Sequence, residues 1–229
     1  MTPPSTRLSP IMVERRGWSR FATLDVDLEA LKGAAKSCGA TVNDAFLAAA
    51  GYGMASYHHK HGAPVERLRA AVAVNTRRPG DSPYGNHARG GSLVIPAGAD
   101  DPATCMRACH DAVALLRDDV RQPLTGAVVM LMSLLGPFVT GFAGAIMKNC
   151  DFAVSNVPGV DIPLFLAGAE VLAIYGFGPT MGTAANIALV SYRDTAFIGC
   201  HVDAAAVPDV DMLVECLRLG FDAVLAVNA

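Results

Sequence analysis

The sequence predicts one α/β domain in which a mixed β-sheet is flanked by helices. Segments of strand character alternate with segments in which apolar residues recur every three or four positions, as on one face of a helix. Two of the last strands follow each other directly, which indicates a mixed sheet rather than a doubly wound parallel one. The chain has 229 residues, of which 52% are hydrophobic, and can therefore bury a substantial core.

The N-terminal part of the chain predicts a strand and a helix. Residues 1–14 are rich in Pro and Ser near their start and are interpreted as a flexible lead-in, which leaves 15–229 as the domain. Residues 18–26 carry apolar side chains among polar ones and predict a strand. Asp27 is suited to cap the following helix, which Gly39 ends.

A second, longer helix begins after Thr41 and ends at Gly62. Thr41 and Asp44 have the spacing of a capping box, in which each side chain bonds the other residue's backbone N–H. A second face of this helix is small enough for close packing and consists of Ala45, Ala48, Ala49 and Gly53.

The middle of the chain predicts two strands and a third helix. Residues 69–75 and 92–96 are apolar strands, and the intervening 78–91, rich in Gly, Pro, Asp and Asn, predicts a long loop. Asp101 and Pro102 suit the cap and first position of a helix.

The C-terminal third predicts four strands and a final helix capped by Asp209. The predicted strands are 152–155, 170–175, 185–192 and 195–202, the last two joined as a hairpin around Arg193 and Asp194.

Residues 122–147 contain no charged residue and are long enough to be a membrane-span candidate. Gly136 and Pro137 interrupt them, however, and the flanks lack a strong Lys/Arg bias. We interpret this segment as two helical pieces that pack on a core or touch a lipid surface, and expect peripheral association rather than insertion.

Composition excludes some classes of partner and site. A net charge of -3 argues against nucleic acid. Cys105, Cys109 and His110 share a predicted helix but lack further ligands at matching spacing, so we expect buried thiols and no metal. Reduced cysteines and the absence of a signal peptide predict a cytoplasmic protein.

A search for catalytic motifs finds no GxSxG, P-loop, GxGxxG or HExxH pattern. The histidines of 58–61 lie at a predicted helix end, where they suit the macrodipole without a further role. Asn43 and Asp44 alone support capping and little more. The turn 156–159 is either structural, the simpler interpretation, or part of a loop that lines a site. His201 is interpreted as a core residue.

A series of short segments occurs in one order along the chain. The segments are 40–44 (ATVND), 68–78 (LRAAVAVNTRR), 85–86 (GN), 155–159 (SNVPG), 166–169 (LAGA), 177–179 (FGP), 186–192 (NIALVSY) and 206–209 (AVPD). In this order they resemble the bacterial wax ester synthase/diacylglycerol acyltransferase family, over roughly residues 15–228.

The resemblance implies the C-terminal lobe of a two-lobed fold similar to chloramphenicol acetyltransferase. Members of the family move a fatty acyl group from acyl-CoA to a fatty alcohol or diacylglycerol. Their catalytic His-His-x-x-x-Asp-Gly loop belongs to the N-terminal lobe. Residues 58–62 do not match it, because no Asp-Gly follows at the required spacing and they lie after the Asn-Asp motif rather than before it. We therefore expect no catalytic residue in this chain.

The resemblance assigns supporting roles to residues of three segments. Asn43 and Asp44 would support the active-site side of the lobe, Asn156, Pro158 and Gly159 would line or brace the acyl channel, and Gly178, Pro179 and Asn186 would shape the adjoining strand ends.

The expected function is that of the C-terminal domain of an acyl-CoA-dependent O-acyltransferase that makes triacylglycerol or wax ester. Such a lobe would be inactive alone, with acyl-CoA as a substrate and no cofactor. Its expected partners are a lipid acceptor and a separate N-terminal lobe or a second copy, with peripheral contact to membranes or lipid droplets. The alternatives are a non-catalytic lipid- or acyl-binding module and a truncated gene product.

Overall fold

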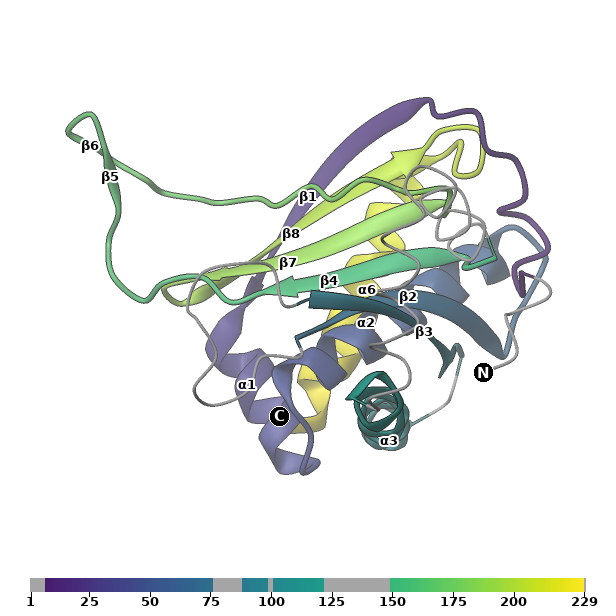
Figure 1. Cartoon of the computed structure of the whole chain (residues 1–229), viewed down its shortest axis with the longest axis horizontal. Coiled ribbons are helices and arrows are strands. Elements are labelled where there is room, and N and C mark those ends of the chain that lie inside the picture. The colour runs from purple at the N-terminus through teal and green to yellow at the C-terminus, as the bar shows by residue number, and fades with distance from the viewer. Residues whose placement is uncertain (1–6, 76–87, 99–100, 122–148, 229) are drawn as a thin grey trace.

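The computed structural model describes residues 7–75, 88–98, 101–121 and 149–228, and these form a six-stranded sheet (Figure 1). The strand order is β1-β8-β7-β4-β2-β3. The strands are β1 (Ser19–Asp27), β2 (Arg67–Asn75), β3 (Ala88–Pro96), β4 (Phe152–Val157), β7 (Ala185–Tyr192) and β8 (Thr195–Asp203). Strand β4 runs parallel to β2 and β7, and the other neighbours are antiparallel. The predicted mixed sheet is confirmed.

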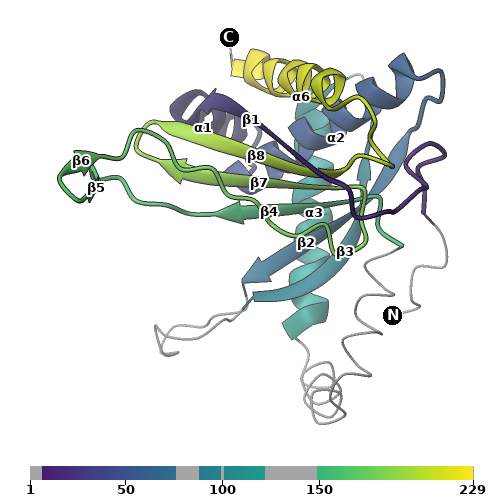
Figure 2. The same cartoon turned by 90° about the horizontal axis from the view of Figure 1, so that it is seen from above.

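The helices of the described chain lie on one face of this sheet (Figures 1 and 2). They are α1 (Leu28–Ser37), α2 (Val42–Lys60), α3 (Pro102–Arg121) and α6 (Val210–Leu225), which the short 3-10 turn η1 (Ala226–Asn228) follows. The predicted caps are confirmed, because Asp27 accepts from the Ala30 N–H, Asp209 accepts from the Met212 N–H, and Thr41 completes its capping box.

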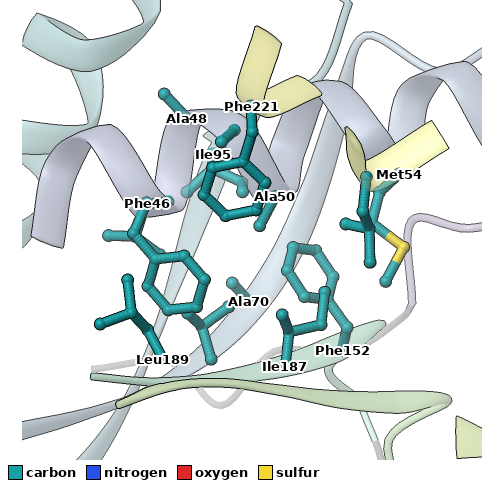
Figure 3. Packing of buried hydrophobic residues seen from close by; sticks show 14 of the residues in the cluster. Phe46, Ala48, Ala50, Met54, Ala70, Ile95, Phe152, Ile187, Leu189 and Phe221 are labelled. Atoms are coloured by element: carbon teal, nitrogen blue, oxygen red, sulfur yellow. The ribbon is translucent and has the colours of Figure 1, made fainter. Parts of the chain in front are cut away.

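The hydrophobic core lies between the helices and the sheet (Figure 3). Phe46 of α2 and Phe221 of α6 stack with ring centroids 6.2 Å apart. Phe152, Ile187 and Leu189 face them from the two parallel central strands, and all five side chains are buried. Burial of such side chains is the main favourable contribution to folding.

Helices α2 and α6 cross closely, as the small face of α2 predicts. A Cβ atom on Gly220 would overlap the carbonyl oxygen of Ala49, and one on Gly53 would overlap the backbone and side chain of Leu217. The two backbones therefore touch at positions where only hydrogen atoms fit.

The opposite face of the sheet is partly covered by the segment between β4 and β7. This segment first leaves the domain as an arm that carries the small hairpin β5 (Phe165–Leu166) and β6 (Ala169–Glu170), and then returns across β8 (Figure 1). On the return, Tyr175 packs edge-on against Phe197, with ring centroids 5.1 Å apart. The Tyr192 hydroxyl holds the base of the arm, because it accepts a hydrogen bond from the Leu164 N–H and donates one to the Val171 carbonyl.

Two predicted elements differ from the structure. The predicted strand 170–175 is wrong, because strand β6 ends at Glu170 and the apolar residues after it continue outside any ladder. The predicted loop 78–91 is wrong at its end, because residues 88–91 already pair with 72–75 of β2. Pairing with a neighbouring strand overrides the weak strand propensity of their Ala-Arg-Gly-Gly sequence.

Part of the predicted lead-in packs on the domain. Met12 is fully buried, and Ser9 accepts a hydrogen bond from the Met12 N–H and contacts His58. The Asp151 carboxylate accepts from the backbone N–H groups of Leu8 and Ser9. Residues 8–12 therefore belong structurally to the domain.

The predicted helical pieces within 122–147 lie outside the described residues. Among the helices that the structure does describe, none combines the length and the apolar character needed to cross a bilayer.

Candidate functional site

A cavity of about 280 Å³ lies where the parallel strands β4 and β7 approach their carboxyl ends. Asn156 and the turn after it form one wall, and Val42 of α2 contributes to another. The lining residues are Leu28, Lys32, Val42, Asn156, Pro158, Gly159, Val160, Asp161, Leu189, Ser191 and Arg193. Carboxyl ends of neighbouring parallel strands are where open α/β sheets bind their ligands.

The turn after Asn156 is held tightly against β7. The Gly159 N–H donates to the Ser191 hydroxyl at 3.0 Å. A Cβ atom on Gly159 would overlap the carbonyl oxygen of Ser191, so glycine is required by this close approach. The Asn156–Gly159 turn thus has a defined position relative to the cavity that it lines.

The start of α2 is fixed by a buried carboxylate. Asp44 is 1% exposed, and its Oδ2 atom accepts from the Thr41 N–H at 2.9 Å and from the Thr41 hydroxyl at 2.8 Å. Asn43 is half-buried in the same helical turn. The capping role expected for Asp44 is present, and it places Val42 at the cavity wall.

Gly178, Pro179 and Asn186 form a separate group. The Asn186 side-chain amide donates to the Pro179 carbonyl at 3.0 Å, and a Cβ atom on Gly178 would collide with that amide. Asn186 alternates along β7 with Ile187, which faces the helices, so Asn186 faces the opposite side of the sheet.

The structure therefore brings the predicted site residues together in two places rather than one. Asn156, Pro158 and Gly159 line the cavity, and Asn43 and Asp44 lie at the helix start beside it. The group around Asn186 is absent from the cavity lining. His201 joins that second group, because its Nδ1 donates to the Gly178 carbonyl at 2.9 Å.

Of the histidines at the end of α2, His58 has a structural role. His58 is fully buried, and its Nδ1 lies 2.7 Å from the Met54 carbonyl, to which it donates. Its Nε2 lies 2.7 Å from the Ser9 hydroxyl. Burial lowers the pKa of His58. Within the described ranges, no three His, Cys, Asp or Glu side chains are grouped so that they could hold a metal ion.

One polar contact at the start of α2 involves a residue that is not among the predicted site residues. His110 of α3 places its Nδ1 2.8 Å from Asp44 Oδ2. The sequence separates these residues by 66 positions, and no local pattern links them. In the sequence, His110 stands out only beside Cys105 and Cys109, as a candidate metal ligand.

Known proteins resemble this chain over most of its length. The family model described as "WS/DGAT C-terminal domain" matches residues 84–224. Rv2484c of Mycobacterium tuberculosis H37Rv, provisionally named as a diacylglycerol O-acyltransferase, is 33% identical over 219 residues, which cover 95% of this chain. The O-acyltransferase WSD of Acinetobacter baylyi is 26% identical over 205 residues, or 87% of this chain. The chain spans 44% of the length of each of these relatives.

Solved structures share the fold. The wax ester synthase/diacylglycerol acyltransferase from Marinobacter aquaeolei VT8 superposes with a TM-score of 0.67 at 20% identity, over 94% of this chain and 51% of that one. A structure concerned with condensation domain-mediated chain release from the enacyloxin polyketide synthase superposes with a TM-score of 0.60 at 15% identity, over 93% of this chain and 42% of that one. The solved structures show the shared fold, and the family model and the mycobacterial relative show that the chain belongs to the WS/DGAT family as its C-terminal domain.

Proposed function

We propose that this chain is the C-terminal lobe of an acyl-CoA-dependent O-acyltransferase that esterifies diacylglycerol or a fatty alcohol. The observation that carries the proposal is the cavity at the carboxyl ends of β4 and β7, which the family-matching Asn156–Gly159 turn lines beside the start of α2. Asn156 presents an amide there, which can both donate and accept hydrogen bonds. Such a group can orient an acceptor hydroxyl or a thioester carbonyl.

The arm between β4 and β7 supports the proposal that a second lobe completes the enzyme. Its apolar side chains lie in solvent: Phe165 is 65% exposed, Leu166 75% and Leu172 79%. A two-stranded hairpin of this length has little stability of its own, and exposed apolar surface commonly marks an interface. The relatives that this chain matches are about twice as long, which leaves room for such a lobe.

The two lobes would contribute different groups to the reaction. The partner lobe would supply the base that takes the proton from the acceptor hydroxyl, whose oxygen then attacks the thioester carbonyl while CoA leaves. The lobe described here would supply one wall of a channel from which water is excluded, because water would otherwise compete as acceptor.

The test is reconstitution in trans. The chain is mixed or co-expressed with the N-terminal half of the mycobacterial relative, and ester formation is measured with palmitoyl-CoA and either dioleoylglycerol or hexadecanol. We expect no ester from the chain alone and ester from the pair, with a loss of at least about tenfold for Asn156→Ala. The matched control is Val160→Ala in the same cavity wall, which removes no hydrogen-bonding group.

Two results would contradict the proposal. Ester formation by the isolated chain would show that no partner lobe is needed. Complex formation without any ester, together with saturable binding of a long acyl chain by this lobe alone, would favour the non-catalytic binding module instead.

A further inference from the structure

His110 and Asp44 form a pair whose geometry the proposed function does not use. Their atoms Nδ1 and Oδ2 are 2.8 Å apart. Asp44 is buried, whereas the His110 side chain is 44% exposed. A carboxylate accepts hydrogen bonds only, so Nδ1 carries the proton and Nε2 of the neutral ring is an unprotonated acceptor.

Asp44 fixes the orientation of the His110 imidazole. Asp44 Oδ2 accepts two hydrogen bonds from Thr41 in addition to the one from His110. The carboxylate therefore cannot turn away without leaving donors unpaired at a helix N-terminus. A buried carboxylate that holds the Nδ1–H of a solvent-accessible histidine is the arrangement that orients a general base and stabilises its protonated form.

The pair also lies at the end of α2 that meets the cavity. Val42, which lines the cavity, is in the same helical turn as Asp44. His110 itself is not among the residues that line this cavity, and its partly exposed ring is accessible from solvent.

The geometry points to His110, oriented by Asp44, as a general base that hydrolyses acyl thioesters on this lobe itself. Nε2 takes a proton from water while the water oxygen bonds to the thioester carbonyl carbon. The C–S bond then breaks, and the departing thiolate takes the proton from the imidazolium, so that a free acid and a thiol result. The choice of a thioester rests on the proposed function, but the activity needs no partner lobe.

The experiment measures release of free CoA from butyryl-CoA by the isolated full chain, followed by chromatography over many turnovers. We expect His110→Ala to lower the rate at least about tenfold, a threshold set below the roughly 100- to 10,000-fold that a positioned general base typically contributes. His59→Ala is the matched control, because His59 is exposed on α2 and would contribute only the background catalysis of any surface imidazole.

Three further variants separate the role of His110 as a base from its contribution to the fold. His110→Asn keeps an N–H donor near the position of Nδ1 but offers no base, so we expect the fold to persist and the rate to fall as in His110→Ala. Asp44→Asn should also lower the rate, since an amide does not stabilise the imidazolium. Thr41→Ala weakens the same helix cap while leaving both members of the pair, and so measures the cost of a looser α2 alone.

The inference is overturned if wild-type chain and His110→Ala release CoA at the same rate, or if His110→Asn retains the wild-type rate. Neither outcome bears on ester formation by the reconstituted pair, which uses a base from the other lobe. The two proposals can therefore fail separately.

Discussion

At the scale of single residues, buried polar groups in this lobe are paired over long distances in sequence. Asp151 joins the N-terminal segment to β2, because its carboxylate accepts hydrogen bonds from the backbone N–H groups of Leu8, Ser9 and Arg69.

Asp203 joins the segment before β1 to strand β8, because its carboxylate accepts a hydrogen bond from a backbone N–H group of that segment. Burial alone would raise the pKa of Asp203, but backbone donors such as the Gly17 N–H outweigh it and lower that pKa. Each carboxylate thus replaces a hydrogen-bonding partner that water would provide.

Because His58 is buried, we expect the domain to lose stability at mildly acid pH. Burial lowers its pKa, although the hydrogen bond to Met54 opposes the shift. In the unfolded chain a histidine has a pKa of about 6.5, so between that value and the lower folded one the unfolded state binds the extra proton. The stabilisation is therefore complete above about pH 6.5 and declines as the pH falls toward the folded pKa.

Urea unfolding at pH 7.5, 6.5 and 5.5 measures this dependence. We expect the free energy of unfolding to fall toward pH 5.5 in the wild type and to fall less steeply in His58→Gln. His59→Gln, an exposed neighbour on the same helix, should keep the wild-type slope. Equal slopes for all three proteins would show that His58 is not the titrating group.

Substitution of Gly159 should lower stability and displace the turn that it belongs to. Gly159→Ala places a methyl group against the Ser191 carbonyl, so the Asn156–Gly159 turn must move. We expect a loss of about 1–3 kcal/mol in the free energy of unfolding, as for other overpacked sites. The same variant should displace the Asn156 side-chain amide resonances in NMR spectra. Val160→Ala, next to it and exposed, should do neither; an unchanged Asn156 signal in Gly159→Ala would contradict the close approach.

At the scale of elements, the crossing of α2 and α6 depends on glycine. Gly220 lies in α6 where its Cα faces the backbone of α2 at Ala49 and Gly53. Glycine inside a helix costs about 1 kcal/mol relative to alanine in helix propensity, so its presence there is explained by packing rather than by local preference.

Gly220→Ala tests which of these opposing effects dominates. Propensity alone predicts a gain of about 1 kcal/mol. We expect a net loss of about 1–3 kcal/mol in the free energy of unfolding, because the methyl group forces the two helices apart. The control Leu219→Ala removes an exposed side chain from the same helix turn and should change stability little. A more stable Gly220→Ala protein would show that the helices adjust without cost.

At the scale of the whole molecule, the lobe has one face covered by helices and an arm that projects beyond the sheet (Figures 1 and 2). The segment 128–147, whose apolar sequence also predicts exposed surface, lies outside the described residues, whereas the arm shows exposed apolar side chains directly. Isolated, such a lobe has apolar surface without a partner.

We expect the isolated chain to self-associate or to bind a dye specific for apolar surface, as measured by sedimentation and fluorescence. The triple variant Phe165→Ser, Leu166→Ser, Leu172→Ser should reduce both and should also weaken pairing with the N-terminal half of the relative. Leu115→Ser is the matched control, because Leu115 is 72% exposed on α3, away from the arm. A monomer that binds no dye would indicate a self-contained domain and would favour the binding-module alternative.

The candidate site illustrates how far sequence patterns reach. Family-matching motifs identified Asn156, Pro158 and Gly159, and the structure places all three at one cavity. The same kind of motif identified Asn186, which the alternation of β7 turns to the other face of the sheet. His110 could not be connected with Asp44 from sequence, because the contact joins residues 66 positions apart, on two helices that strands β2 and β3 separate in the chain.

The sequence by itself determined the elements whose signals are local: the capped helices after Asp27, Thr41 and Asp209, the β7–β8 hairpin, the mixed sheet and the family. Tertiary structure alone decided where pairing and burial compete with local preference. Residues 88–91 became strand because β2 was available to pair with them. Residues 171–175 remained outside a ladder because they pass over the face of β8 rather than along the edge of a strand. Caps and periodicity depend on residues a few positions apart, whereas these outcomes depend on which distant segment lies alongside.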